Sequence, residues 1–338
     1  MKRILASLAL AVGITGPAAA QEVELSLSHW VPAVHPLQVL GMEMWAKSVE
    51  EDSNGRIKVT IYPAQQLGAA PDHYDMARDG IVDMAFVSPG YQPGRFPIFA
   101  AAELPFQFTN AKGGSAAAHE WYMQYADKEM DDTFVCMVNL HDPGTFHGKT
   151  GPLLMPSDFK GKNIRPANGT LARAVNLIGG ASVQVPAPGM RDALEKGTAD
   201  VTASPWGSLF TFGAQDIVTH HLDMPLYVSA FTYNINKDKL ASLSDENRKV
   251  IMDHCTPEWS EKVASGWADV EAAGRQKIID LGGHTLYTPN AEQVAVWKET
   301  MAPLLDEWKA NATKAGIDAN AAYDSFMAML KKYNSFVE

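Results

Sequence analysis

The chain of 338 residues contains only two cysteines, and beyond its first twenty residues it has no run of about twenty apolar residues. Because a helix needs about that many to cross a bilayer, we expect no stable insertion into a membrane. Basic residues are also scarce, since 28 Lys and Arg stand against 39 Asp and Glu. Nucleic acids and anionic membrane surfaces repel such a chain, so the composition argues against both as partners.

Several catalytic motifs are missing as well. The chain has no Gly-x-Ser-x-Gly, no Gly-x-x-x-x-Gly-Lys and no Gly-x-Gly-x-x-Gly after a strand. Its ten histidines include no His-Glu-x-x-His, and there is no Cys-x-x-Cys. We therefore predict no metal, no cofactor and no enzymatic activity. The alternative is an enzyme that uses a histidine near a strand end as its base, and the histidines so placed are His29, His35, His141 and His147.

The first twenty residues have the pattern of a secretory signal peptide. Two basic residues precede an apolar run over residues 4–14, and three alanines end at Ala20. This arrangement predicts cleavage after Ala20 and export to the periplasm. In that oxidising compartment Cys136 and Cys255 are able to pair. Their spacing leaves both a disulfide and two free buried thiols open.

One pattern occurs twice in the chain. A helix is followed by Gly80-Ile81-Val82-Asp83, an apolar run and Ser88-Pro89, and a second helix by Gly197-Thr198-Ala199-Asp200, an apolar run and Ser204-Pro205. The glycine fits a left-handed helix C-cap, and the apolar run fits a buried strand. The pattern is common in α/β proteins, but two copies favour two similar lobes. Ligands bind beyond the carboxyl ends of such strands, so both Ser-Pro segments should border one cleft.

The segment before the first copy reads as a β-α-β unit. Residues 23–28 alternate and deliver His29 and Trp30 to a strand end, Pro36 opens a helix, and residues 57–61 alternate again. Such a unit requires a parallel pair of strands.

Two crossings are predicted between the lobes. Asp142-Pro143-Gly144 breaks the chain after a strand, and the alternating residues 231–236 return it to the first lobe. Residues 245–281 are predicted to form a long helix that contacts both lobes. The expected division is a signal peptide at 1–20, a first lobe at 21–144 plus about 233–270, and a second lobe at 145–232 plus about 271–338.

Arg165 ends a short predicted strand, where its guanidinium would project into the cleft. The planar guanidinium binds a carboxylate through two parallel, charge-assisted hydrogen bonds. A surface ion pair is the alternative role for an arginine. Trp30, Phe146 and Trp206 also lie beside predicted strand ends, where aromatic side chains either wall a pocket or fill the core.

Six segments, taken together in order and spacing, resemble the DctP-like solute-binding subunits of tripartite ATP-independent periplasmic (TRAP) transporters. The resemblance extends from Leu25 to about Leu305. The segments are Gly55-Arg56-Ile57-Lys58-Val59, Tyr62-Pro63 through Gln66-Leu67-Gly68, Gly80-Ile81-Val82-Asp83-Met84, Glu103-Leu104-Pro105-Phe106, Asp158-Phe159-Lys160-Gly161-Lys162-Asn163-Ile164-Arg165, and Ala193-Leu194 through Gly197 and Asp200.

The resemblance implies a two-lobed α/β periplasmic binding protein of the Venus-flytrap type, which closes on a small organic acid and delivers it to TRAP membrane subunits. It also implies that Arg165 binds the carboxylate. Relatives for acidic sugars often carry a second arginine after the hinge Gly-Thr, where this chain has Phe146. A ligand with one carboxylate and an apolar or aromatic body is therefore expected.

The residues expected to touch the ligand come from the cleft segments of both lobes. They are Arg165, Phe146, Trp206, Ser204, Trp30, Ser88, Tyr91 and His29. A zwitterion with a quaternary ammonium is the alternative ligand, because tryptophan faces attract such cations. A receptor for an ATP-driven importer is the alternative within the same fold. We expect the protein to be a monomer.

Overall fold

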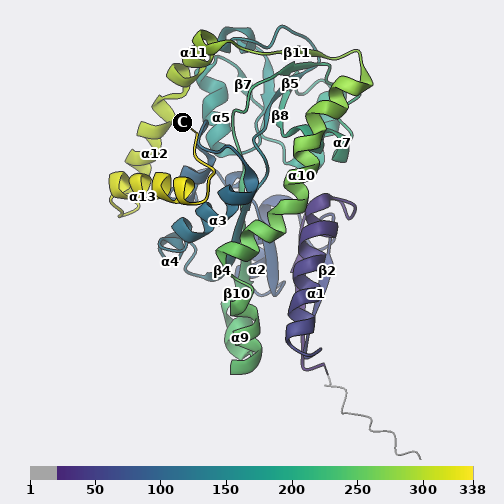
Figure 1. Cartoon of the computed structure of the whole chain (residues 1–338), viewed down its shortest axis with the longest axis vertical. Helices are drawn as coiled ribbons and strands as arrows, with labels where there is room; N and C mark the ends of the chain where they lie inside the picture. Colours follow the sequence, from purple (N-terminus) through teal and green to yellow (C-terminus); the bar gives the residue numbers. More distant parts are fainter. Residues whose placement is uncertain (1–20, 338) are drawn as a thin grey trace, which may run out of the picture.

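The computed structural model describes residues 21–337, which form two lobes stacked along the long axis of the molecule (Figure 1). The predicted signal peptide at residues 1–20 lies outside the described residues. We call the half with the five-stranded sheet the first lobe and the half with the six-stranded sheet the second lobe. The predicted two-lobed α/β fold is thus confirmed.

The first sheet has the strand order β2-β1-β3-β10-β4. β1 pairs in parallel with β2 and β3, as the β-α-β pattern predicts, whereas β10 runs antiparallel to both of its neighbours. The return of β10 to the first lobe is therefore confirmed. The strands are β1 (Val23–Ser28), β2 (Ile57–Tyr62), β3 (Met84–Val87), β4 (Thr133–Leu140) and β10 (Ala230–Asn236).

The second sheet has the strand order β11-β9-β5-β8-β6-β7. β6 is parallel to β7 and β8, whereas β5 is antiparallel to β8 and β9. The strands are β5 (Thr145–Gly148), β6 (Asn163–Arg165), β7 (Ala181–Ser182), β8 (Val201–Ser204), β9 (His220–Leu222) and β11 (Thr285–Tyr287).

Helices cover both sheets. They are α1 (Glu43–Asp52), α2 (His73–Arg78), α3 (Ala111–Tyr122), α4 (Ala126–Glu129), α5 (Gly169–Leu177), α6 (Met190–Glu195), α7 (Trp206–Thr211), α8 (Lys237–Ser242), α9 (Asp245–Asp253), α10 (Pro257–Leu281), α11 (Ala291–Met301), α12 (Pro303–Lys314) and α13 (Ala319–Lys332). Four of the short helical turns are η1 (Leu37–Met42), η3 (Pro89–Tyr91), η4 (Phe99–Glu103) and η6 (Ala187–Gly189).

The two copies of the sequence pattern have matching local structures. Gly80 follows α2 and Gly197 follows α6, with φ of 70° and 74°, a conformation that favours glycine. Asp83 and Asp200 each accept a hydrogen bond from a backbone N–H of a neighbouring parallel strand, at 2.8 and 3.0 Å. The copies therefore share both their helix caps and the contact that holds the following strand.

The long helix is shorter than predicted but contacts both lobes (Figure 1). The single helix expected over residues 245–281 is wrong, because the chain breaks between α9 and α10. Pro257 has no N–H to continue a helix, and Thr256 caps the new one by accepting a hydrogen bond from a backbone N–H. α10 then packs on α3 and η1 of the first lobe and on α7 of the second.

A disulfide joins the segment between α9 and α10 to β4. Cys136 and Cys255 are bonded, with their Cα atoms 4.5 Å apart, which resolves the alternative that the sequence left open. The bond joins β4, an edge strand of the first sheet, to the segment just before the helix that spans both lobes.

The C-terminal helices do not belong to the second lobe alone, although residues 271–338 were expected there. Trp121 of α3 packs against Phe326 of α13 with ring centroids 4.7 Å apart. Trp308 of α12 donates to the backbone O of Ile98 at 3.2 Å. These helices therefore cover the first lobe as well.

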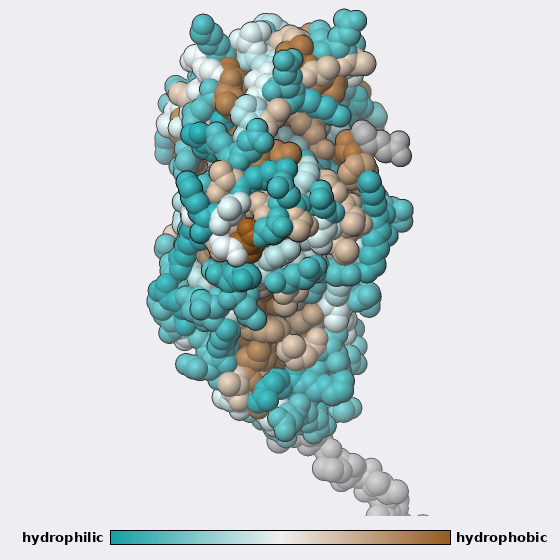
Figure 2. Space-filling view, turned by 90° about the vertical axis from the view of Figure 1, so that its left-hand side faces the viewer, coloured by the Kyte–Doolittle hydropathy of each residue, from teal (hydrophilic) through white to brown (hydrophobic). Residues whose placement is uncertain are grey.

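Charged and polar residues cover most of the face in Figure 2, and apolar residues reach it in small patches. Within residues 21–337, no helix combines the length and the apolar character needed to cross a membrane.

Candidate ligand-binding site

A small cavity of about 40 Å³ lies between the lobes, where the strand ends of both sheets meet. Its aromatic wall is Trp30, Tyr91, Phe212, Tyr227, Phe231 and Trp267. Its polar side chains are His35, His141, Arg165, Ser204, Ser208 and Ser229. Within the described chain no Asp or Glu lines it. The cavity therefore has one permanent charge, which is positive.

Arg165 is the last residue of β6, and its side chain is buried with 3% exposed. Its Nε donates to the backbone O of Val185 at 2.7 Å, and its Nη1 donates to the backbone O of Ala203 at 2.9 Å. These carbonyls fix the guanidinium without neutralising it. Burying an uncompensated charge is costly, so an anionic partner would stabilise this arrangement.

Arg165 differs from every other arginine among residues 21–337. Each of the others lies within 4.0 Å of a carboxylate, and they are Arg56, Arg78, Arg95, Arg173, Arg191, Arg248 and Arg275. Arg165 donates to two backbone carbonyls and also lies beside the hydroxyl of Tyr91, but no carboxylate of the described residues pairs with it. The surface ion pair that the sequence left open as its alternative role is therefore absent in the described chain.

The histidines of the cavity are neutral. Burial lowers the pKa of His141 to about 4 and that of His35 to about 3. His141 donates from Nδ1 to the backbone O of Asp142 and accepts at Nε2 from the N–H of Ser229, at 2.7 and 2.8 Å. Arg165 is therefore the only cation at the site near neutral pH.

Two contacts hold the walls of the cavity together. The hydroxyl of Tyr91, on the first lobe, accepts a hydrogen bond from the N–H of Ala187 on the second lobe at 2.9 Å. Glu271 of α10 accepts from the indole N–H of Trp267 at 2.6 Å and from the N–H of Ser208 at 2.9 Å. Burial raises the pKa of Glu271 to about 7, and these donors oppose the rise. Glu271 thus positions Trp267 relative to α7.

Four of the eight residues predicted at the site line this cavity, and four do not. Trp30, Tyr91, Arg165 and Ser204 line it. Phe146 points the other way, because it alternates with its neighbours on β5, and it packs in the core against Phe159 at 5.0 Å between ring centroids. Phe146 therefore does not line this cavity.

The other three residues outside the cavity are buried elsewhere. Trp206 begins α7 and packs against His147 and His221, with ring centroids 4.8 and 5.3 Å away. His29 is bonded through Nε2 to the side chain of Gln38 at 2.9 Å. Ser88 is buried beside η3 but is absent from the lining.

Sequence patterns missed the aromatic residues contributed by helices and crossings, namely Phe212, Tyr227, Phe231 and Trp267. Phe231 lies in a strand that was predicted, and its alternation gave a usable indication of its face. No local pattern distinguishes Trp267 from the other apolar residues of its helix, because its neighbours come from both lobes.

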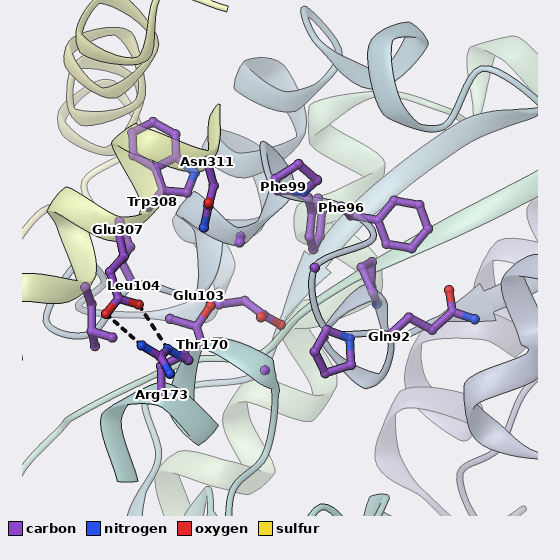
Figure 3. Close-up of a pocket in the computed structure, with 18 of the residues that line it drawn as sticks. Gln92, Phe96, Phe99, Glu103, Leu104, Thr170, Arg173, Glu307, Trp308 and Asn311 are labelled. Carbon is purple, nitrogen blue, oxygen red and sulfur yellow. Dashed lines mark hydrogen bonds and ion pairs between the residues drawn. The ribbon is translucent and has the colours of Figure 1, made fainter. Parts of the chain in front are cut away.

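A larger groove of about 530 Å³ lies on the outside, between η4, α5 and α12 (Figure 3). Its arginine, Arg173, is paired with Glu307 through two hydrogen bonds of 2.9 and 3.0 Å. Burial raises the pKa of Glu103, which also lines the groove, to about 8. The cations of the larger groove, Arg173 and Lys314, are exposed, whereas Arg165 is buried, and we therefore place the candidate site in the smaller inner cavity.

Two hinged α/β lobes around a cavity with a buried cation define a solute-binding protein. Residues 27–311 match the model of bacterial extracellular solute-binding protein family 7, DctP, and the chain belongs to this family. The resemblance seen in the sequence is thereby confirmed.

Several known proteins similar to this chain are solute-binding proteins. A TRAP solute-binding protein from Rhodoferax ferrireducens, solved with copurified benzoate, is 30% identical with a TM-score of 0.87, over 92% of this chain and 98% of that one. One from Bordetella bronchiseptica, solved with (R)- and (S)-mandelate, has the same identity and TM-score over 92% and 99%. The C4-dicarboxylate-binding periplasmic protein DctP of Rhodobacter capsulatus is 25% identical over 95% and 97%.

Proposed function

We propose that this chain is the periplasmic receptor of a TRAP transporter for a monocarboxylate with an aromatic or apolar body. It is exported by the signal peptide at residues 1–20, binds the acid between its lobes and delivers it unchanged to the membrane subunits. The solved relatives with benzoate and mandelate support this class of ligand.

The observation that carries the proposal is the buried guanidinium of Arg165, which has carbonyl partners but no carboxylate among residues 21–337. A ligand carboxylate supplies the missing negative charge through charge-assisted hydrogen bonds. The neutral histidines give no support for a second anionic group on the ligand. One carboxylate is therefore the charge that the cavity best accommodates.

The aromatic wall accounts for the rest of the ligand. Trp30 and Phe231 of the first lobe and Trp267 of α10 face the cavity, and aromatic rings bury apolar surface while packing in defined orientations. Of the four histidines considered as a base, His29 and His147 do not line the cavity, whereas His35 and His141 do. Both ring nitrogens of His141 are bonded to the backbone, which supports binding without conversion.

Binding requires the lobes to open. A cavity of about 40 Å³ has room for only a few waters, since one water needs roughly 10–15 Å³ by the same measure. We propose rotation about the crossings at residues 140–146 and 227–236, which are joined by a hydrogen bond from Gly144 N to Tyr227 O of 2.8 Å. The Tyr91–Ala187 hydrogen bond would break on opening and re-form around the ligand.

Calorimetric titration with benzoate and mandelate tests the proposal. Removing one partner of a buried charge pair costs about 2–5 kcal/mol, so Arg165→Ala should weaken binding at least about thirtyfold. Arg173→Ala is the matched control, because it removes an arginine that is paired on the outside, and it should change affinity less than about twofold. A loss below about threefold for Arg165→Ala would contradict the assignment.

Further measurements distinguish the alternatives. Binding of a betaine in preference to every acid would favour the zwitterion. Recovery of the unaltered acid from denatured protein would exclude turnover. Copurification with TRAP membrane subunits, rather than with an ATPase-linked importer, would establish the delivery partner.

A further inference from the structure

Two hydrogen-bond donors in the wall of the inner cavity have no partner among residues 21–337. They are the indole Nε1 of Trp30 and the hydroxyl of Tyr227. Both side chains are buried, with 3% and 2% exposed. Buried donors are almost always satisfied, so each of these unpaired groups calls for an explanation.

Trp30 differs from most of the buried tryptophans. In the described chain, five others donate their indole N–H to a carbonyl or carboxylate at 2.6–3.2 Å, and they are Trp45, Trp121, Trp267, Trp297 and Trp308. The ring of Trp30 packs against Phe86 and Tyr91 of the first lobe, each with centroids 5.5 Å away. These rings therefore fix the orientation of Trp30, which lines the cavity.

The guanidinium of Arg165 limits how a carboxylate can bind. Its Nε and one hydrogen of Nη1 are already used by Val185 and Ala203. A carboxylate must then accept from the remaining hydrogens of the two Nη atoms. Tyr227 and Arg165 both line this cavity. Burial raises the pKa of the Tyr227 hydroxyl, so it stays protonated and is able to donate. A carboxylate has about four acceptor sites, so it can also accept from the Tyr227 hydroxyl.

This accounting leaves the N–H of Trp30 without an acceptor. Trp30 belongs to the first lobe, whereas Arg165 extends from the second. We propose that the ligand is an aromatic acid with a second, uncharged oxygen acceptor, which is a hydroxyl or a carbonyl; this inference rests on the proposed function. The second oxygen accepts a hydrogen bond from Trp30 Nε1, while Arg165 and Tyr227 bind the carboxylate. Trp30 then distinguishes oxygenated aromatic acids from their unsubstituted analogues.

Matched ligands test this proposal in the unmodified protein. The hydroxybenzoates and mandelate would be compared with the methylbenzoates and 2-phenylpropanoate, in which a methyl group replaces each hydroxyl. At least one oxygenated acid should bind about tenfold or more tightly than its methyl counterpart, because the latter leaves a buried donor unpaired. Equal affinities throughout would overturn the proposal.

Two substitutions assign the roles. Trp30→Phe removes the N–H and keeps an aromatic ring, so it should reduce the preference for the oxygenated acid to less than about threefold. Tyr227→Phe should weaken both members of a pair by a similar factor, because it acts on the carboxylate that they share.

The controls separate hydrogen bonding from packing. Trp267→Phe makes the same change of ring at a wall residue whose N–H is already bonded to Glu271, so it should leave the preference unchanged. Tyr233→Phe removes a buried, unpaired hydroxyl outside the cavity and should leave both affinities unchanged. An equal loss of preference in Trp30→Phe and Trp267→Phe would overturn the role of the N–H.

The two proposals fail in different ways. If the acids bind and depend on Arg165 but the methyl analogues bind equally well, only the second acceptor is wrong. If no acid binds, or if Arg165→Ala changes nothing, the proposed function itself is wrong and this inference falls with it.

Discussion

The two lobes share a local pattern but contribute different chemistry to the cavity between them. The first lobe supplies aromatic rings, including Trp30, Tyr91 and Phe231, and the second supplies Arg165 and the carbonyls that orient it. The repeated helix-Gly-strand pattern gives both lobes the same helix caps and strand contacts. Similar backbone structure in the two lobes therefore does not imply similar roles, because the side chains at the strand ends differ.

The lobes also differ in how they are stabilised. The disulfide Cys136–Cys255 ties the first sheet to the start of α10. The second lobe contains a chain of histidines, in which Nδ1 of His147 lies 2.8 Å from Nδ1 of His221 and Nε2 of His221 lies 2.9 Å from Nδ1 of His284. His147 is also bonded to the backbone O of Ser204 at 3.0 Å. The predictions below test this contrast.

The largest effect is expected from the disulfide. Replacing Cys136 and Cys255 together by serine opens a loop of 119 residues, which the chain-entropy model values at about 4–5 kcal/mol. We expect the free energy of unfolding to fall by about that amount in urea titrations, while acid affinity changes little, because neither cysteine lines the cavity.

Each single serine variant is the control for loss of one sulfur. The single and double variants should be equally destabilised, since either breaks the bond. If the double variant kept its full free energy of unfolding, the disulfide would not account for a difference in stability between the lobes.

The next effect is expected from the histidine chain at acid pH. Burial lowers the pKa of His221 to about 2 and that of His147 to about 4. The folded protein then binds fewer protons than the unfolded chain below about pH 6.5, so its free energy of unfolding falls as the pH decreases. From pH 7 to pH 5, one such histidine accounts for a loss of about 2 kcal/mol.

His221→Gln should therefore lose about 2 kcal/mol less than the parent protein between those pH values, even if it is less stable at pH 7. Urea titrations at both pH values measure the difference. His119→Gln is the matching variant in the first lobe, because burial lowers the pKa of His119 to about 4 as well. Unchanged pH dependence in His221→Gln would show that this histidine is protonated in the folded protein.

The smallest effect compares the two aspartates of the repeat. Asp83 accepts from the N–H and the hydroxyl of Ser26, both at 2.8 Å, and lies 3.2 Å from Lys239 Nζ. Asp200 accepts from one backbone N–H at 3.0 Å and is more exposed. Asp83→Ala should cost about 1 kcal/mol more than Asp200→Ala, because it removes an additional hydrogen bond. Thermal unfolding of both variants gives the difference, and equal costs would show that the copies are energetically equivalent.

Much of the fold could be predicted from local patterns. The alternation in β1 and β2, the glycines after α2 and α6, and the strand that ends at Arg165 all appear as predicted. These features depend on neighbouring residues, whose spacing the chain displays directly. The predicted helix over residues 245–281 failed at Pro257, where a cap and a proline start a new helix.

The candidate site was only half predictable. Trp30, Tyr91, Arg165 and Ser204 line the cavity as expected, because strand ends of both sheets meet there. Phe146 and Trp206 also lie near strand ends, but they face the core of the second lobe. An aromatic residue near a strand end satisfies either environment, and only its neighbours in space select one.

The sequence by itself determined the α/β class, the two lobes and the position of Arg165 at a strand end, because hydrophobic period, turn residues and caps act over a few residues. Only the tertiary structure decided which arginine lacks a carboxylate, which aromatic rings line the cavity and whether the cysteines pair. Those properties depend on distances between residues that are remote in the chain, and such distances exist only after folding.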